Sequence, residues 1–115
     1  MSKKVLVIDD SPTIRQQVAL CLSGSGYQVV EAVDGLDAMG KREGCAIAIC
    51  DVNMPRMNGI EFVEKVGTGA MPVVMLTTEG KPELIDRARK AGAKGWMVKP
   101  FKPDQLLSVV KKLVG

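Results

Sequence analysis

The feature that most constrains the fold is a short apolar run that ends in an acid. Residues 46–50 contain no polar side chain, and Asp51 follows them directly. The turn formers Pro55, Asn58 and Gly59 come within the next eight residues. An unbroken apolar run bounded by turn formers is typical of a strand buried on both faces, as in parallel sheets. Asp51 is therefore expected at the carboxyl end of a strand, where open α/β sheets place their ligands.

A carboxylate in that position has two interpretations. Burying it is costly unless a partner compensates its charge. Asp51 is therefore either a structural cap for the following turn or a reactive group. Asp51 considered alone does not distinguish these two roles. The residues at the ends of the other strands do.

The remaining chain repeats the same strand pattern with helices in between. Ile14, Val18, Cys21 and Leu22, for example, have the spacing of one helix face. Alternating strands and helices predict a single α/β domain over residues 1–115, with a parallel sheet covered by helices on both faces. The expected strands are 4–9, 27–32, 46–51, 72–77 and 95–98, and the expected helices begin near Pro12, Leu36, Asn58, Pro82 and Pro103.

Helix ends can be placed from individual residues. Ser11-Pro12 is a predicted N-cap with proline in the first turn, and Asn58 with Glu61 has the spacing of a capping box. The second helix is expected over residues 36–42. Gly40 would then lie inside it and cost about 1 kcal/mol relative to alanine.

Composition excludes several classes of protein. Apolar residues make up 46% of the 115 residues, and no apolar run approaches the ~20 residues of a membrane span. The N-terminal apolar run is too short for a secretory signal, so we expect a cytoplasmic protein. Cys21, Cys45 and Cys50 show no C-x-x-C spacing and are predicted to be buried free thiols. The absence of histidine excludes histidine metal sites, Ser-His-Asp triads and an internal phosphohistidine.

Four of the five predicted strands end in a functional group. Asp9 and Asp10 follow the first strand, Asp51 the third, Thr77 the fourth and Lys99 the fifth. Two carboxylates ~4 Å apart repel by about 4 kcal/mol at an effective dielectric near 20, so three of them need counter-charges. Lys99 supplies one. The negative charge that remains suits Mg²⁺, a hard cation that binds carboxylates and bridges to phosphate.

These residues together resemble a known family. Asp9-Asp10, Asp51 with Met54-Pro55 and Gly59, Thr77, and Lys99-Pro100-Phe101 are similar to the motifs of response regulator receiver domains, in particular single-domain, CheY-like chemotaxis receivers. The resemblance spans the chain from Lys4 to about Val114. It implies a flavodoxin-like three-layer (βα)5 sandwich with strand order 2-1-3-4-5, and a cis peptide bond before Pro100.

The resemblance also implies the phosphorylation site. Asp51 would accept a phosphoryl group from the phosphohistidine of a sensor histidine kinase. Mg²⁺ would be bound by Asp10, Asp51 and the backbone carbonyl of Asn53, with Asp9 holding it through water.

The resemblance assigns the response to three further residues. Lys99 would pair with the phosphoryl group, and the Thr77 hydroxyl would move to hydrogen-bond it. Trp96 takes the place of the family's switch aromatic. As it turned inward, it would change the surface of the fourth helix, fifth strand and fifth helix.

We therefore expect a phosphorylation-gated signalling module, not a separate enzyme, that phosphorylates and dephosphorylates itself. Because the chain ends with its fifth helix, output is expected from docking to a downstream protein, such as the flagellar motor switch or another chemotaxis component. Nucleic-acid binding, membrane insertion and oligomerisation are not expected. Residues 81–115 carry a net charge of +6 against −3 for residues 1–80, which favours an acidic partner segment.

Other functions remain open at this stage. A phosphorelay intermediate or phosphate sink would use the same chemistry. A haloacid-dehalogenase-like phosphatase would place a second aspartate where Asn53 stands and its nucleophile after the first strand. A flavodoxin-like FMN binder would place the phosphate of FMN against three carboxylates, which would repel it.

Overall fold

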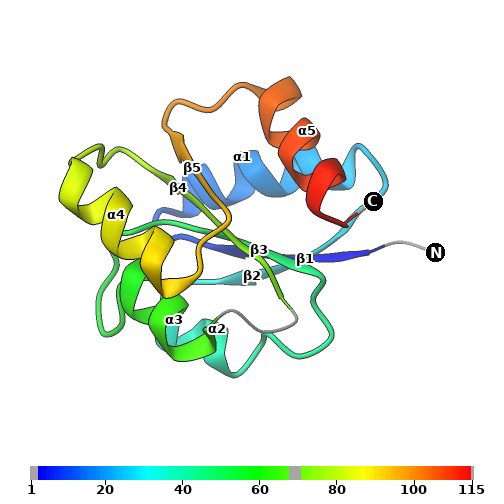
Figure 1. The fold of residues 1–115 in the computed structure, drawn as a ribbon. Helices are drawn as coiled ribbons and strands as arrows, with labels where there is room; N and C mark the ends of the chain where they lie inside the picture. Colours follow the sequence, from blue (N-terminus) through cyan, green and yellow to red (C-terminus); the bar gives the residue numbers. More distant parts are fainter. Residues whose placement is uncertain (1–2, 68–70, 115) are drawn as a thin grey trace.

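The computed structural model describes residues 3–67 and 71–114. A parallel five-stranded sheet runs through its centre in the order β2-β1-β3-β4-β5 (Figure 1). This confirms the α/β class and the strand order that the resemblance implied. The elements are β1 Lys4–Ile8, α1 Pro12–Ser23, β2 Gln28–Ala32, α2 Gly35–Met39, β3 Ile47–Cys50, α3 Gly59–Val66, β4 Val73–Thr77, α4 Pro82–Ala91, β5 Gly95–Val98 and α5 Pro103–Val114.

The helices form two layers, α1 and α5 on one face of the sheet and α2, α3 and α4 on the other (Figure 1). Successive strand side chains point to opposite faces, so each apolar strand serves both layers. In β1, Val5 and Val7 pack towards α1 and α5, whereas Leu6 and Ile8 pack towards α2 and α3. This division explains why β1, β3 and β4 are continuously apolar and not alternating.

The register of the central strands sets the position of the acids. Ile8 of β1 pairs with Cys50 of β3, and Cys50 pairs in turn with Met75 of β4. The residues after these strands therefore emerge at one edge of the sheet. Asp51 stays joined to that frame because its backbone N–H donates to the Ile8 carbonyl at 2.9 Å.

The predicted caps are confirmed. The Ser11 side chain accepts a hydrogen bond from the Ile14 backbone N–H, and Asn58 and Glu61 form both bonds of a capping box. The fifth strand spans the residues predicted for it. The Lys99-Pro100 peptide bond is cis, as the resemblance implied.

Two expectations were wrong in detail. Helix α2 ends at Met39, and Gly40 is its C-cap with φ −83°, so the expected cost of a glycine inside the helix does not apply. The helix is short because the Gly40 backbone N–H bonds back to Asp37 in a tightened last turn. Of the three free thiols only Cys50 is buried, since Cys21 and Cys45 lie at partly exposed positions.

Among the described residues, no helix has both the length and the apolar character needed to cross a bilayer.

Candidate functional site

The three acids predicted at the sheet edge lie together. Asp9 and Asp10 follow β1, and Asp51 follows β3. One carboxylate oxygen from each of the three residues lies within 4.8 Å of the other two. Asp9 and Asp51 are buried, with 4% and 7% of their surface exposed, whereas Asp10 is exposed. The cluster therefore has two acids fixed in the protein and one that faces solvent.

Lys99 bridges the two buried acids from the end of β5. Its ammonium lies 2.7 Å from Asp9 Oδ2 and 3.2 Å from Asp51 Oδ2. The other carboxylate oxygens accept backbone hydrogen bonds, Asp9 Oδ1 from Ser11 at 2.9 Å and Asp51 Oδ1 from Val52 at 2.7 Å. Both oxygens of each carboxylate are thus engaged, which fixes the orientation of the two side chains.

The charges at this site do not balance. Burial by itself lowers the pKa of Lys99, but the hydrogen bond to Asp9 and the nearby charges of both acids outweigh it and raise that pKa. Lys99 is therefore a cation that pairs with two of the three clustered carboxylates. The remaining negative charge and the all-oxygen donor set fit a hard divalent cation such as Mg²⁺, which typically takes one or two carboxylates and keeps several waters.

The predicted response residues lie on the β4–β5 side of the cluster. Thr77 is fully buried, and its Oγ1 accepts from the Glu79 backbone N–H at 3.2 Å. The Glu79 carboxylate accepts from the Asn53 side-chain amide at 3.2 Å, and the Glu79 carbonyl accepts from the Trp96 indole at 3.0 Å. Glu79 therefore joins the loop after Asp51, the threonine and the aromatic in one set of contacts. No pattern along the chain signals this arrangement.

Gly59 is required by a close approach that sequence reasoning did not identify. A Cβ built on Gly59 would overlap the backbone oxygen of Asp51 and lie 2.8 Å from Met75 Cε. The Gly59 N–H also donates to the Val52 carbonyl at 2.9 Å. The first residue of α3 thus packs directly against the backbone of the acid.

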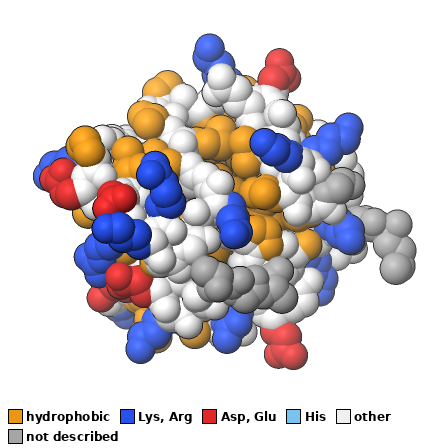
Figure 2. Space-filling model, viewed as in Figure 1, with side chains coloured by type: hydrophobic (Ala, Val, Ile, Leu, Met, Phe, Trp, Pro, Cys, Tyr) orange, Lys and Arg blue, Asp and Glu red, His pale blue; other side chains and the backbone are white. Residues whose placement is uncertain are grey.

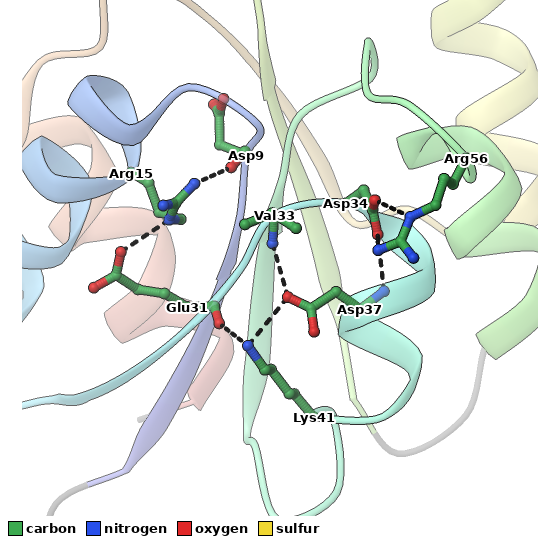
Figure 3. A network of polar contacts seen from close by, with 8 residues as sticks. All are labelled: Asp9, Arg15, Glu31, Val33, Asp34, Asp37, Lys41 and Arg56. Carbon is green, nitrogen blue, oxygen red and sulfur yellow. Dashed lines mark hydrogen bonds and ion pairs between the residues drawn. The ribbon is translucent and has the colours of Figure 1, made fainter.

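Sequence reasoning also missed the contacts of two arginines, one at the Asp9 carbonyl and one in the loop after Asp51 (Figure 3). Arg15 of α1 donates to the Asp9 carbonyl at 2.7 Å and to Glu31 of β2 at 2.9 Å. Arg56, in the loop after Asp51, makes two hydrogen bonds to the carboxylate of Asp34. The spacing of these residues along the chain reveals neither pair.

Asp34 is a buried acid whose charge depends on Arg56. Only 2% of its surface is exposed, and Arg56 Nε lies 2.7 Å from Asp34 Oδ2. The hydrogen bonds from Arg56, followed by that from the Asp37 backbone, lower the pKa of Asp34 against the opposing effect of burial. The pair therefore stabilises the fold only while Asp34 is ionised.

This pair gives a pH-dependent prediction. Because the folded pKa of Asp34 is lowered, its contribution is complete above the unfolded value of about 3.9 and is lost as the pH falls towards the folded pKa. An asparagine side chain at this position can still cap α2, so Asp34→Asn removes the charge and keeps the cap. Urea unfolding measured from pH 6 down to acid should show a shallower loss of stability below about pH 4 for Asp34→Asn than for the wild type. Equal slopes would contradict the assignment.

Comparisons with known proteins agree with this geometry. The model of the response regulator receiver domain family matches residues 5–111. The chain is 39% identical over 120 residues to chemotaxis protein CheY1 of Helicobacter pylori, covering 97% of both chains. It has the same identity to the chemotaxis protein CheY homolog of Campylobacter jejuni, covering 97% of this chain and 92% of that protein.

Solved structures give the same result. Chemotaxis protein CheY4 of Vibrio cholerae superposes with a TM-score of 0.90 at 42% identity, covering 98% of this chain and 99% of the other. A putative response regulator from Chloroflexus aurantiacus superposes with a TM-score of 0.91 at 29% identity, covering 99% and 98%. The family match covers nearly the whole chain, and the chemotaxis proteins that the chain resembles are covered over 92% or more of their length. This chain belongs to the receiver-domain family of response regulators, as a CheY-like member.

Proposed function

We propose that this protein is a phosphorylation-gated signalling module that accepts a phosphoryl group on Asp51. One observation carries the proposal: a buried aspartate at the end of the central strand is grouped with two further acids and bridged to one of them by a protonated lysine. A cap for the following turn would need neither the other acids nor the lysine. The arrangement fits a carboxylate kept ionised and oriented for attack.

The proposed reaction moves a phosphoryl group between two side chains. A carboxylate oxygen of Asp51 forms a bond to phosphorus while the bond from phosphorus to the imidazole nitrogen of a kinase phosphohistidine breaks. The electron pair of that bond stays on the imidazole. Mg²⁺ held by Asp10, Asp51 and the Asn53 carbonyl, with Asp9 acting through water, would neutralise charge on the phosphoryl oxygens. Hydrolysis of the acyl phosphate would later restore Asp51.

Lys99 and Thr77 are placed to respond to the new group. Phosphorylation removes the carboxylate charge of Asp51 that Lys99 now contacts at 3.2 Å, and the phosphoryl oxygens offer a stronger anionic partner. The Thr77 Oγ1 accepts from the Glu79 backbone N–H at 3.2 Å, a contact that does not use the hydroxyl proton. We expect that proton to be donated to the phosphoryl group.

The contacts of Glu79 provide a route from the site to the surface. Movement of Thr77 would disturb the Glu79 backbone, whose carbonyl holds the indole of Trp96. Trp96 of β5 is partly buried and lines a groove together with Ile85, Arg89 and Lys94. A change in Trp96 would therefore change the shape of the α4–β5 surface.

The output is proposed to be docking of a downstream protein in chemotaxis. The relatives from Helicobacter pylori, Campylobacter jejuni and Vibrio cholerae are named as chemotaxis proteins. Hydrophobic side chains bordered by lysine and arginine are visible over β5 and α5 (Figure 2), where Met97 and Val109 line a shallow groove. Such a surface suits a partner segment that is apolar and acidic.

The sole tryptophan allows a direct test. Trp96 fluorescence is recorded while Mg²⁺ and then beryllofluoride, a phosphoryl mimic, are added to the wild type and to Asp51→Asn. We expect the mimic to change the emission of the wild type only, because a trapped phosphoryl analogue needs the Asp51 carboxylate. If the mimic leaves both spectra alike, Trp96 is no part of the response.

A further inference from the structure

We infer that the segment of residues 31–37, which contributes no group to the phosphorylation site, positions both loops that carry the metal ligands. This anchor segment comprises the end of β2 and the start of α2. The inference rests on the proposed Mg²⁺ site. It assigns Arg56 and Asp34, together with Arg15 and Glu31, as positioning residues and not as ligands.

The first loop is held through Arg15. The side chain of Arg15 is 15% exposed and lies between Glu31 of the anchor segment and the Asp9 carbonyl, at 2.9 Å and 2.7 Å. The Asp9 backbone N–H donates to the Ala32 carbonyl at 3.1 Å. Both peptide groups of Asp9 are thereby tied to β2, and the second of them leads directly to Asp10.

The second loop is held through Arg56. Its guanidinium donates to both carboxylate oxygens of Asp34, at 2.7 Å and 3.1 Å. Arg56 has φ 62°, a left-handed conformation that is uncommon for residues other than glycine and persists where the surroundings impose it. A bidentate pair to a buried acid is such a surrounding, because leaving Asp34 unpaired would cost more than the strained backbone.

Backbone contacts tighten the same junction. The Gly35 N–H donates to the Met57 carbonyl at 2.9 Å, and a Cβ on Gly35 would lie 2.7 Å from that oxygen. The loop is therefore fixed at Asp51, the residue after β3, and again at Arg56 and Met57. Asn53 lies between these two points, so its carbonyl has little freedom to move.

The anchor segment is itself cross-linked by side-chain hydrogen bonds (Figure 3). Asp34 Oδ1 accepts from the Asp37 backbone at 2.8 Å, and Asp37 Oδ2 accepts from the Val33 backbone at 3.0 Å. Lys41 joins Asp37 Oδ2 to the Glu31 carbonyl, at 3.1 Å and 2.9 Å. Carboxylates that orient a ligand-bearing group are a known source of metal affinity, so loss of the anchor should weaken Mg²⁺ binding.

The test measures Mg²⁺ affinity by titration calorimetry and stability by urea unfolding, under conditions where each variant is folded. Arg56→Gly removes the ion pair and retains access to a positive φ, and Asp34→Asn removes the charge and retains the cap. Each single variant is expected to raise the Mg²⁺ Kd roughly tenfold. The double variant should bind Mg²⁺ with the same Kd as either single variant, because the two residues act as one unit.

A matched ion pair serves as the control. Arg87 of α4 contacts both carboxylate oxygens of Glu64 in α3, at 3.1 Å and 2.9 Å, with no contact to the acids. Glu64→Gln with Arg87→Gln should leave the Mg²⁺ Kd unchanged, even if stability falls. Glu31→Gln tests the other loop and should weaken Mg²⁺ binding in the same direction.

The outcomes separate this inference from the proposed function. A wild type that binds no Mg²⁺ overturns the proposed metal site and this inference with it. A wild type that binds Mg²⁺, with Kd unchanged in Arg56→Gly and Asp34→Asn, overturns the inference alone. Lower stability without a change in Kd would show that the pair only supports the fold.

Discussion

Asp51→Asn is expected to abolish phosphoryl uptake, since the amide has neither the negative charge nor the nucleophilic oxygen of the carboxylate. The fold should survive, because Lys99 keeps its shorter contact to Asp9 at 2.7 Å. Purified protein is incubated with Mg²⁺ and acetyl phosphate and examined by intact-mass and peptide mass spectrometry. The wild type should gain one acid-labile phosphoryl group on Asp51, and the variant should gain none.

An acid outside the site provides the control for this experiment. Asp86 of α4 also pairs with a lysine, Lys90, at 3.0 Å, but both side chains are exposed. Asp86→Asn should be phosphorylated like the wild type. Labelling of Asp51→Asn at the wild-type level, or a label located on Asp10, would disprove the assignment of Asp51.

Gly59→Ala is expected to destabilise the protein by about 3 kcal/mol or more, at the upper end of the cost of overpacking a core. The added methyl would overlap the Asp51 carbonyl oxygen, and backbone at the end of β3 cannot move aside without breaking its hydrogen bonds. Urea unfolding measures the loss. Where the variant does fold, a displaced Asp51 should also slow phosphorylation.

Gly40→Ala is the matched control for the glycine substitution. Gly40 is a C-cap with φ −83° and ψ −8°, a conformation open to alanine, and among the described residues a Cβ there would approach Asp37 O at an unstrained 3.7 Å. Alanine should stabilise the protein by roughly 0.4–1 kcal/mol by restricting the unfolded chain. A Gly59→Ala protein as stable as Gly40→Ala would mean that the loop after Asp51 yields freely.

The sheet and its polar edge can be predicted well because both follow from short-range rules. Apolar runs that stop at Asp9, Asp51 and Thr77 mark strand ends, and parallel strands bring their carboxyl ends to one edge. Caps such as Asn58 with Glu61 depend on a spacing of three residues and could be located from the chain. The grouping of Asp9 with Asp51 follows from these rules together.

The supporting contacts could not be predicted because they join distant residues through side-chain orientation. Nothing in the sequence pairs Asp34 with Arg56 or Glu31 with Arg15, and a positive φ at an arginine has no local signal. Asp34 alone has the character of a turn residue. The length of α2 was also misjudged, because a glycine inside a helix is tolerated at a cost of about 1 kcal/mol and only the capping bonds show that residue 40 ends the helix.

The order of the strands has a consequence for how such a protein can diverge. Acids come from β1 and β3, while the threonine, the aromatic and the lysine come from β4 and β5, with β3 and β4 as the boundary between these halves. Of the described contacts at the site, those of Lys99 and the Asn53–Glu79 pair cross that boundary. Under the proposed function, substitutions on the β4–β5 half that spare Thr77, Lys99 and Glu79 can therefore change the surface offered to a partner while the acids of the other half keep their positions.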